Sequence, residues 1–473
     1  MSNFRTRLLL LCRPVGIVLV VICMGLTQRP EARGQSSIFS GQVRPFVVGI
    51  NPVVGNGAVG GVSIDANGLL DRATIDAVGN LAEARAQAVE SQVPADVAVT
   101  SKLRKVSLRR LELAIYERLK AGEPLEEEML MLAGLQNVQF IFLNPEENDV
   151  IVAGTAGGWT LDEHGTVVGL ETRSPVLQLE DLLVVLRSIH SAHESGITCS
   201  IDPSAEGLAR LQDYFSAGPR MGEMALRRME KLVGSQSVTV TGVPADSHFA
   251  RVMVAADFIM KRIAMGLEKS PTRRVPSYMQ MLRSARVPVP KTAMPRWWLA
   301  PDYSAPLRDV DGLAFALPSS GVKVMTEDSY LNEDGTLERV EDANPAAVDW
   351  ANRFSEHYVE LAKRLPVLAE LRNLMDLAIV AAIVRNPQLG DKVGHDFPLL
   401  SNEEILPVVS YHVPKTVSSR SSFVKKGNQY IISISGGVDL APGAVLGTAT
   451  LDDKVLSNRE QAIAGTQQNW WWD

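Results

Sequence analysis

The sequence predicts an α+β fold in which antiparallel and mixed sheets pack against helices. Short runs of alternating apolar residues, such as 238–240, are interspersed with longer segments whose apolar residues recur every three or four positions. Turn residues separate the strand-like runs. Hydrophobic residues make up 46% and charged residues 21% of the 473 residues, a composition typical of globular proteins rather than of disordered chains.

Strand-like and helix-like segments follow one another in mixed order. Strands are expected where alternating or β-branched apolar residues lie between turn residues, and helices where the apolar period is near 3.6 and a cap or proline marks an end. The expected strands are 62–64, 138–143, 150–152, 197–201, 238–240, 312–317, 322–326, 337–340, 411–424 and 429–435, and the expected helices are 73–89, 103–120, 124–132, 179–191, 202–215, 221–233, 246–267, 344–365 and 366–384.

The first 34 residues have the pattern of a secretory signal peptide. Arg5 and Arg7 give a positive start, and Ala32 and Gly34 place small residues at the two positions that a signal peptidase reads. The uninterrupted apolar run 15–26 has 12 residues, fewer than the ~20 that span a bilayer. We therefore expect export to the periplasm or the extracellular space, with cleavage near Gly34. An uncleaved anchor is the alternative.

The predicted mature chain is acidic and keeps one cysteine. Residues 1–34 hold five arginines and one glutamate, so their removal leaves 42 basic and 53 acidic residues, a net charge of −11. This charge disfavours nucleic acid and anionic membranes as partners. No later run is long and apolar enough to span a membrane. Because Cys199 stands alone, an intramolecular disulfide is excluded and the core has to hold the fold.

We expect six consecutive regions. They are the signal peptide 1–34, an extended lead-in 35–57, an N-terminal α/β part 58–270, a proline-rich crossover 271–308, a C-terminal part of β-meander and helices 309–447, and a polar tail 448–473. The α/β part contains two segments of the form Gly-Gly-x-x-aliphatic-Asp-x-x-Gly, at 60–68 and 157–165. Each predicts a hairpin followed by a helix. An old duplication and two independent hairpins both remain open.

No cofactor is predicted. Residues 55–60 match the dinucleotide pattern G-x-G-x-x-G, but a strand is expected after them where that motif needs a helix. The chain contains neither G-x-S-x-G nor a P-loop. The candidate sites therefore rest on small groups of side chains that the predicted fold would bring together, and not on known catalytic motifs.

The stretch 237–268 reads as a strand, a turn and a long helix with Asp246 as its N-cap. Asp257 and Lys261 lie four residues apart at the edge of the apolar stripe, in the order that favours an ion pair. One interpretation is a partly buried structural pair. The other is a polar site lining a cleft, in which both side chains are candidate catalytic groups.

A second constellation combines two histidines with the cysteine. His190 and His193 share one helical face, and Cys199 lies on the next strand, so the three side chains are candidate metal ligands. The spacing matches no zinc-hydrolase motif, and histidines are favoured at a helix C-terminus by the dipole alone. Cys199 is also a candidate nucleophile with His193, and a buried strand thiol is the alternative.

The tail ends in three tryptophans, Trp470, Trp471 and Trp472. If exposed, they form a contact patch for an unknown protein or envelope component. The alternative is that they fold back on the body of the protein.

Several segments carry a family resemblance. They are 149–154 with 158–159, 199–203 with 206–208, 241–247, 256–257 with 260–261, and 295–298, and the resemblance that they carry extends over about residues 60–440. These segments resemble a family of exported bacterial proteins of unknown function that is best represented in planctomycetes. The resemblance implies export and a single architecture, and it implies no catalytic residues.

Two functions follow as hypotheses. The first is a non-catalytic envelope or secreted protein that binds a partner or supports an assembly. The second is an exported enzyme, such as a hydrolase, with a cleft at Asp257 and Lys261 or a metal site at His190, His193 and Cys199.

Overall fold

The computed structural model describes three short strands and most of the chain from residue 93 onward. The described residues are 58–59, 62–64, 70–72, 93–162, 165–219, 222–283, 294–302, 306–317, 321–331, 337–340, 344–386, 389, 392–394, 396–411, 413–420, 422–426, 429–433, 435–440, 449–464 and 471–473. They belong to one compact unit, residues 44–473. The predicted signal peptide, the lead-in 35–57 and the predicted helix 73–89 lie outside the described residues.

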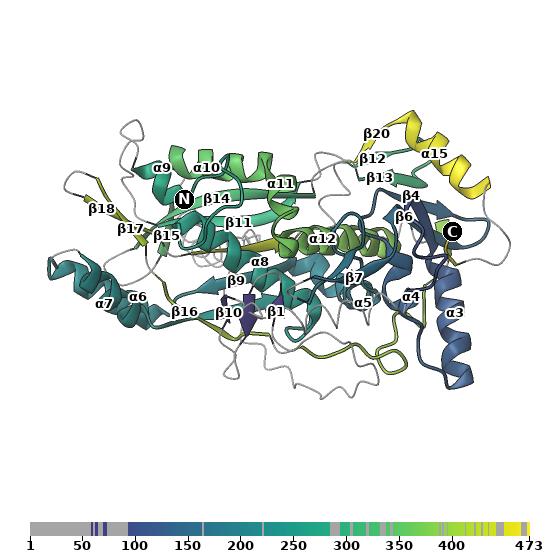
Figure 1. Ribbon diagram of the computed structural model, residues 1–473, viewed down its shortest axis with the longest axis horizontal. Helices are drawn as coiled ribbons and strands as arrows, with labels where there is room; N and C mark the ends of the chain where they lie inside the picture. The colour runs from purple at the N-terminus through teal and green to yellow at the C-terminus, as the bar shows by residue number, and fades with distance from the viewer. Residues whose placement is uncertain are drawn as a thin grey trace, which may run out of the picture. The chain divides into compact units, whose positions relative to one another are not determined.

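The α+β prediction is confirmed, and the described strands form two large sheets and three small ones (Figure 1). One large sheet has the order β15-β14-β11-β19-β9-β10-β16 and the other the order β20-β12-β13-β5-β6-β4. The first comprises β9 (Ile197–Asp202), β10 (Ser235–Thr241), β11 (Met294–Asp302), β14 (Gly321–Leu331), β15 (Leu337–Val340), β16 (Thr416–Ser418) and β19 (Ser435–Leu440). The second comprises β4 (Ser101–Ser107), β5 (Phe140–Asn144), β6 (Asp149–Ala156), β12 (Leu307–Arg308), β13 (Ala314–Ala316) and β20 (Thr450–Leu451).

The first large sheet draws its strands from three of the predicted regions. Antiparallel β9 and β10 come from 58–270, β11 from 271–308, and β14, β15, β16 and β19 from 309–447. Strand β11 runs parallel to β19 and antiparallel to β14. The region boundaries themselves stay predictions, but the chain segments on either side of residues 270 and 308 share this sheet.

An expected hairpin begins in each of the two Gly-Gly segments, and its second strand follows directly after the segment. In the first, β2 (Val62–Ile64) pairs antiparallel with β3 (Leu70–Arg72), and β1 (Ala58–Val59) pairs with β2. In the second, β7 (Trp159–Leu161) pairs antiparallel with β8 (Val167–Gly169). Gly165 in the second turn has a φ of +82°, a backbone conformation that glycine adopts without strain. The remaining small sheet is the hairpin of β17 (Ser422–Lys426) and β18 (Gln429–Ser433).

One predicted helix was wrong at its start. The segment 103–120 was expected to be helical throughout, but 101–107 form β4, and the helix α3 spans Leu108–Ala121. The apolar stripe of the helix begins only at Leu108, and the residues before it pair with β6 along the sheet. The side chain of Ser107 then caps α3 by accepting a hydrogen bond from the Arg110 N–H at 3.1 Å.

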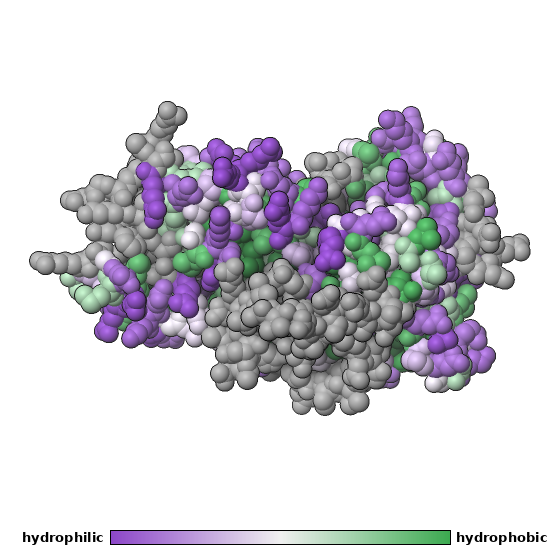
Figure 2. All heavy atoms as spheres, in the orientation of Figure 1, coloured by the Kyte–Doolittle hydropathy of each residue, from purple (hydrophilic) through white to green (hydrophobic). Residues whose placement is uncertain are grey.

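The described helices cover the sheets through their apolar faces. They are α3 (Leu108–Ala121), α4 (Glu127–Leu130), α5 (Leu179–Ser195), α6 (Ala205–Ser216), α7 (Glu223–Val233), α8 (His248–Met265), α9 (Tyr278–Leu282), α10 (Pro345–Glu356), α11 (Tyr358–Ala362), α12 (Pro366–Arg385) and α15 (Asp453–Ala464), with a 3₁₀ turn at Leu132–Gly134. Trp350 and Phe354 of α10 are fully buried, whereas hydrophilic residues dominate its outer surface (Figure 2). Within the described ranges, none of the helices has both the length and the apolar character that a membrane span requires.

Helices α6 and α7 form a hairpin between the antiparallel strands β9 and β10. Leu208, Leu211, Met229 and Val233 make a small apolar cluster of their own between the two helices. The helices approach closely at Gly207, where an added Cβ would lie 2.3 Å from the Val233 carbonyl oxygen. This hairpin is therefore stabilised mainly within itself.

Helix α8 is the most completely buried long helix next to the first large sheet. It packs on β9 and β19 and contacts α5 and α12 (Figure 1). All of its residues except Arg262 are buried. The predicted N-cap was wrong by one residue: Ser247 Oγ accepts from the Ala250 N–H at 3.1 Å, while the Asp246 carboxylate accepts from Ser410.

Candidate functional site

Helix α8 carries two buried polar clusters, and the first contains the predicted ion pair. Lys261 Nζ lies 2.8 Å from Asp257 Oδ2, and Asp257 has no exposed surface. Lys261 Nζ also donates to the Ile201 carbonyl of β9 at 3.3 Å. The geometry favours the structural interpretation, because both charged groups face the sheet inside the core.

Burial changes the pKa of the carboxyl group in this pair. Burial raises the pKa of the Asp257 carboxyl to about 6, although the nearby Lys261 ammonium opposes the shift. Asp257 Oδ1 has no hydrogen-bond donor among the described residues. At neutral pH the Asp257 carboxyl is therefore mostly ionised, and its charge depends on the neighbouring Lys261 for compensation.

Cys199 lies on β9 with no exposed surface. Burial, with a smaller contribution from the Asp257 carboxylate, raises the pKa of its thiol well above the usual value. A protonated, sealed thiol is a poor nucleophile and a poor metal ligand.

His190 and His193 lie in the last part of α5, and their side chains lie outside the described residues, so their part in a metal site stays a prediction. Within the described residues, no group of three or more His, Cys, Asp or Glu is arranged to hold a metal ion.

We expect Cys199 to resist thiol reagents in the folded protein. Burial keeps the thiol protonated and out of contact with solvent. Labelling with a chromogenic disulfide should be slow in buffer and complete in denaturant, with the Cys199→Ser variant as the blank. Rapid labelling of the folded protein would show that the thiol is accessible, as a nucleophile requires.

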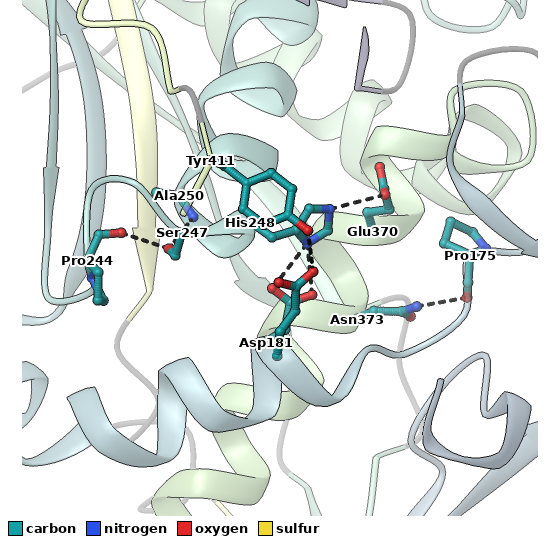
Figure 3. Close-up of polar contacts among 10 residues, drawn as sticks. Pro175, Asp181, Pro244, Ser247, His248, Ala250, Glu370, Asn373 and Tyr411 are labelled. Carbon is teal, nitrogen blue, oxygen red and sulfur yellow. Dashed lines mark hydrogen bonds and ion pairs between the residues drawn. The ribbon is translucent and has the colours of Figure 1, made fainter. Parts of the chain in front are cut away.

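The second cluster was not predicted, and it centres on His248, the first residue of α8 (Figure 3). We call the side chains of Glu180, Asp181, His248, Glu370 and Tyr411 the His248 cluster. His248 Nδ1 lies 3.0 Å and 3.1 Å from the two carboxylate oxygens of Asp181 on α5. On the opposite side of the ring, Nε2 lies 3.9 Å from Glu370 Oε1 on α12. The cluster thus joins three helices that pack around the core.

Tyr411 attaches a fourth segment to the same place. Its hydroxyl donates to Glu180 Oε1 at 2.6 Å, and its ring centroid lies 5.3 Å from that of His248. Its backbone N–H donates to the Asp246 carbonyl at 2.6 Å. The Arg251 guanidinium lies 5.6 Å from the centre of the Tyr411 ring, a cation–π distance. These contacts hold the chain around residue 411 against α5 and the start of α8.

The cluster shares its protons among groups with little access to solvent: Asp181, His248 and Glu370 are buried, and Glu180 and Tyr411 are half-buried. Burial raises the pKa of Glu180 and of Glu370 to about 7, and the charge of His248 limits both shifts. Burial alone would lower the pKa of His248, but the surrounding carboxylates, with Asp181 foremost, outweigh it and raise the pKa to about 9. At neutral pH His248 is therefore cationic, and each of the two glutamates is protonated part of the time.

A small cavity adjoins the cluster. It has a volume of about 10 Å³, and Asp181, His248, Glu370 and Asn373 provide polar groups in its wall. That is close to the smallest space that accepts one water molecule. Glu370 Oε2, which is buried, has no hydrogen-bond donor among the described residues. The arrangement can hold and move protons, but its cavity is far too small for an organic substrate.

The sequence left open whether the three C-terminal tryptophans form an exposed contact patch or pack on the body of the protein. The structure shows the second arrangement for Trp471 and Trp472. Trp471 and Trp472 are half-buried and pack against the body of the protein. The Trp471 carbonyl accepts a hydrogen bond from the Ser107 N–H at 2.8 Å, at the edge of β4. Trp470 lies outside the described residues.

Comparison with known proteins gives one partial match. A family described as "Protein of unknown function (DUF1598)" matches residues 199–278. This segment runs from β9 through α6, α7, β10 and α8 to the start of α9, so it contains His248, Asp257 and Lys261. Neither the curated proteins nor the solved structures contain a match to the chain. The resemblance to proteins of unknown function is confirmed for this segment.

Proposed function

We propose that the protein is exported and acts as a non-catalytic binding or assembly protein in the cell envelope or the secreted space. Support for export comes from the signal-peptide pattern of residues 1–34. The resemblance to an exported, planctomycete-type family points the same way.

One observation carries the non-catalytic part of the proposal: the groups best suited to catalysis are sealed in the core. Asp257 and Cys199 have no exposed surface. The cavity beside His248 holds about 10 Å³, whereas pockets for small molecules have volumes of about 300 Å³ or more. Buried charge pairs and shared protons of this kind are well suited to fixing one arrangement of α5, α8 and α12.

Export is tested by the N-terminus of the protein that cells produce. Full-length chain expressed in a Gram-negative host should appear in the periplasm with Gln35 as its first residue, because cleavage follows Gly34. Mass spectrometry of the N-terminal peptide checks this. The Val20→Arg variant, which interrupts the apolar run, should stay uncleaved in the cytoplasm. Recovery of the unaltered chain uncleaved in the cytoplasm would contradict export.

An exported enzyme is the second candidate, and the His248–Asp181 pair is the observation that favours it. A histidine oriented by a carboxylate through Nδ1 is a common general base. We expect that the protein does not turn over generic ester, phosphate, peptide or glycoside substrates in a reaction that depends on His248. A turnover that a folded His248→Gln variant loses would support the enzyme and overturn the non-catalytic proposal.

A further inference from the structure

We propose that the outer edge of β4 is a peptide-binding groove for an extended segment with a tryptophan followed by an acidic residue. Residues 471–473 of the chain itself occupy the groove here. Such a groove would supply the binding activity proposed above, and the inference rests on that proposed function.

The main chain of residues 471–473 continues the second large sheet beyond β4. One edge of β4 pairs with β6. At the other edge, the Ser107 N–H donates to the Trp471 carbonyl at 2.8 Å, and the Asp473 N–H donates to the Lys105 carbonyl at 3.1 Å. Val106 and Trp472 form an antiparallel bridge between these bonds. This is strand addition to a sheet edge, a mode in which the main chain provides affinity for an extended peptide.

Lys105 of β4 binds the carboxylate of Asp473, the acidic residue of the segment, through two of its groups. The Lys105 N–H donates to Asp473 Oδ1 at 3.0 Å, and Lys105 Nζ lies 2.6 Å from Asp473 Oδ2. Lys105 Nζ also donates to the Ala462 carbonyl of α15 at 3.1 Å, which fixes its position. Because the Lys105 side chain is only 10% exposed, its attraction to the carboxylate is weakly screened by solvent.

The ring of Trp472 lies on the guanidinium of Arg104, which backbone carbonyls of the protein body hold in place. The Arg104 guanidinium lies 4.9 Å from the centre of the Trp472 ring. It donates to the carbonyls of Val97, Val99 and Ala133 at 2.9, 2.7 and 2.7 Å, and Arg104 is 2% exposed. None of these three bonds involves residues 471–473. The platform for the indole is therefore built by the body of the protein and does not depend on the segment that occupies it.

A peptide in solution tests the groove. The probe is a fluorescent peptide of residues 467–473, blocked at both ends, and the receptor is the full chain with Trp472→Ala and Asp473→Ala, which weaken its own segment. We expect saturable binding by anisotropy to this receptor. Binding to the unaltered chain should be at least about tenfold weaker, because a tethered segment competes at an effective concentration in the millimolar range.

A charge exchange separates recognition from a folding defect. Adding Lys105→Glu to the receptor should abolish binding of the normal peptide, and a peptide carrying Asp473→Lys should then bind again. Circular dichroism checks that each receptor is folded. Equal binding of the normal and the reversed-sequence peptide, or no binding by a folded receptor at about 1 mM peptide, would overturn the groove. Either result leaves the tests of export and turnover untouched, so failure of the groove is distinguishable from failure of the proposed function.

Discussion

The Lys261→Met variant is expected to lose about 3–5 kcal/mol of the free energy of unfolding at neutral pH. The substitution removes the ammonium that lies 2.8 Å from Asp257 Oδ2 and leaves a carboxylate with no exposed surface inside the core. The protein must then either bury an unpaired charge or protonate Asp257, and both cost free energy. Urea unfolding followed by circular dichroism measures the loss.

Two further variants make this prediction sharp. The double variant Asp257→Leu with Lys261→Met should recover much of the loss, since apolar side chains of similar size replace the whole pair. Arg353→Met removes the cation of another i,i+4 pair, with Asp349 on α10, whose side chains are 45% and 51% exposed; it should cost about 1 kcal/mol or less. Equal losses in Lys261→Met and Arg353→Met would contradict a buried structural role for the Asp257–Lys261 pair.

The second large effect is a stability that falls as pH rises. Glu180 and Glu370 have an ordinary pKa of 4.5 that is raised to about 7 in the folded protein, so between these values the folded state holds protons that the unfolded state has lost. His248 behaves alike between 6.5 and about 9. A raised folded-state pKa contributes stability that is fully present below the unfolded pKa and lost as pH rises through the folded one. Each group changes the free energy of unfolding by about 1.4 kcal/mol per pH unit within its window.

The urea midpoint should therefore decline steadily between pH 4.5 and pH 9, the range that these three groups span. In the variant with Glu180→Gln and Glu370→Gln, the decline between pH 4.5 and 7 should be much shallower, because two of the titrating groups are gone. The net negative charge of the chain also makes stability depend on pH, but the unaltered protein and the double variant share this effect, because their charges differ by at most two. The difference between their two pH profiles therefore reports on Glu180 and Glu370. A midpoint that rises with pH in the unaltered protein would contradict the shared-proton account.

The sequence predicted those parts of the fold that depend on local patterns. The hairpin at β7 and β8 needs a glycine with positive φ, and Gly165 supplies it. The buried α8 follows from its apolar period, and the Asp257–Lys261 pair from its spacing on one helix. Strand β4 was missed because its basic residues directly precede the amphipathic helix α3 and read as its first turn, whereas their pairing with β6 makes them a strand.

The His248 cluster depends on tertiary packing that local patterns do not contain. Asp181 alone reads as an acidic residue in the first turn of a helix, where the dipole favours it. Glu370 reads as one of several polar positions in the first half of a helix that is apolar further on, and Tyr411 lies in an irregular segment. These residues meet only because α5, α8 and α12 pack together. The sealed space between their polar side chains gives the cluster its shifted pKa values.

The charge state of His248 is the most direct test of the central claim, that ionised groups sealed around α8 hold the core together. Nitrogen NMR of labelled imidazoles, with His248 assigned by its absence in the His248→Gln variant, reports protonation of the ring directly. The structure predicts a cationic ring at neutral pH that loses its proton near pH 9, held by Asp181 through Nδ1. A neutral ring at pH 7, titrating at or below the ordinary value of 6.5, would contradict the claim.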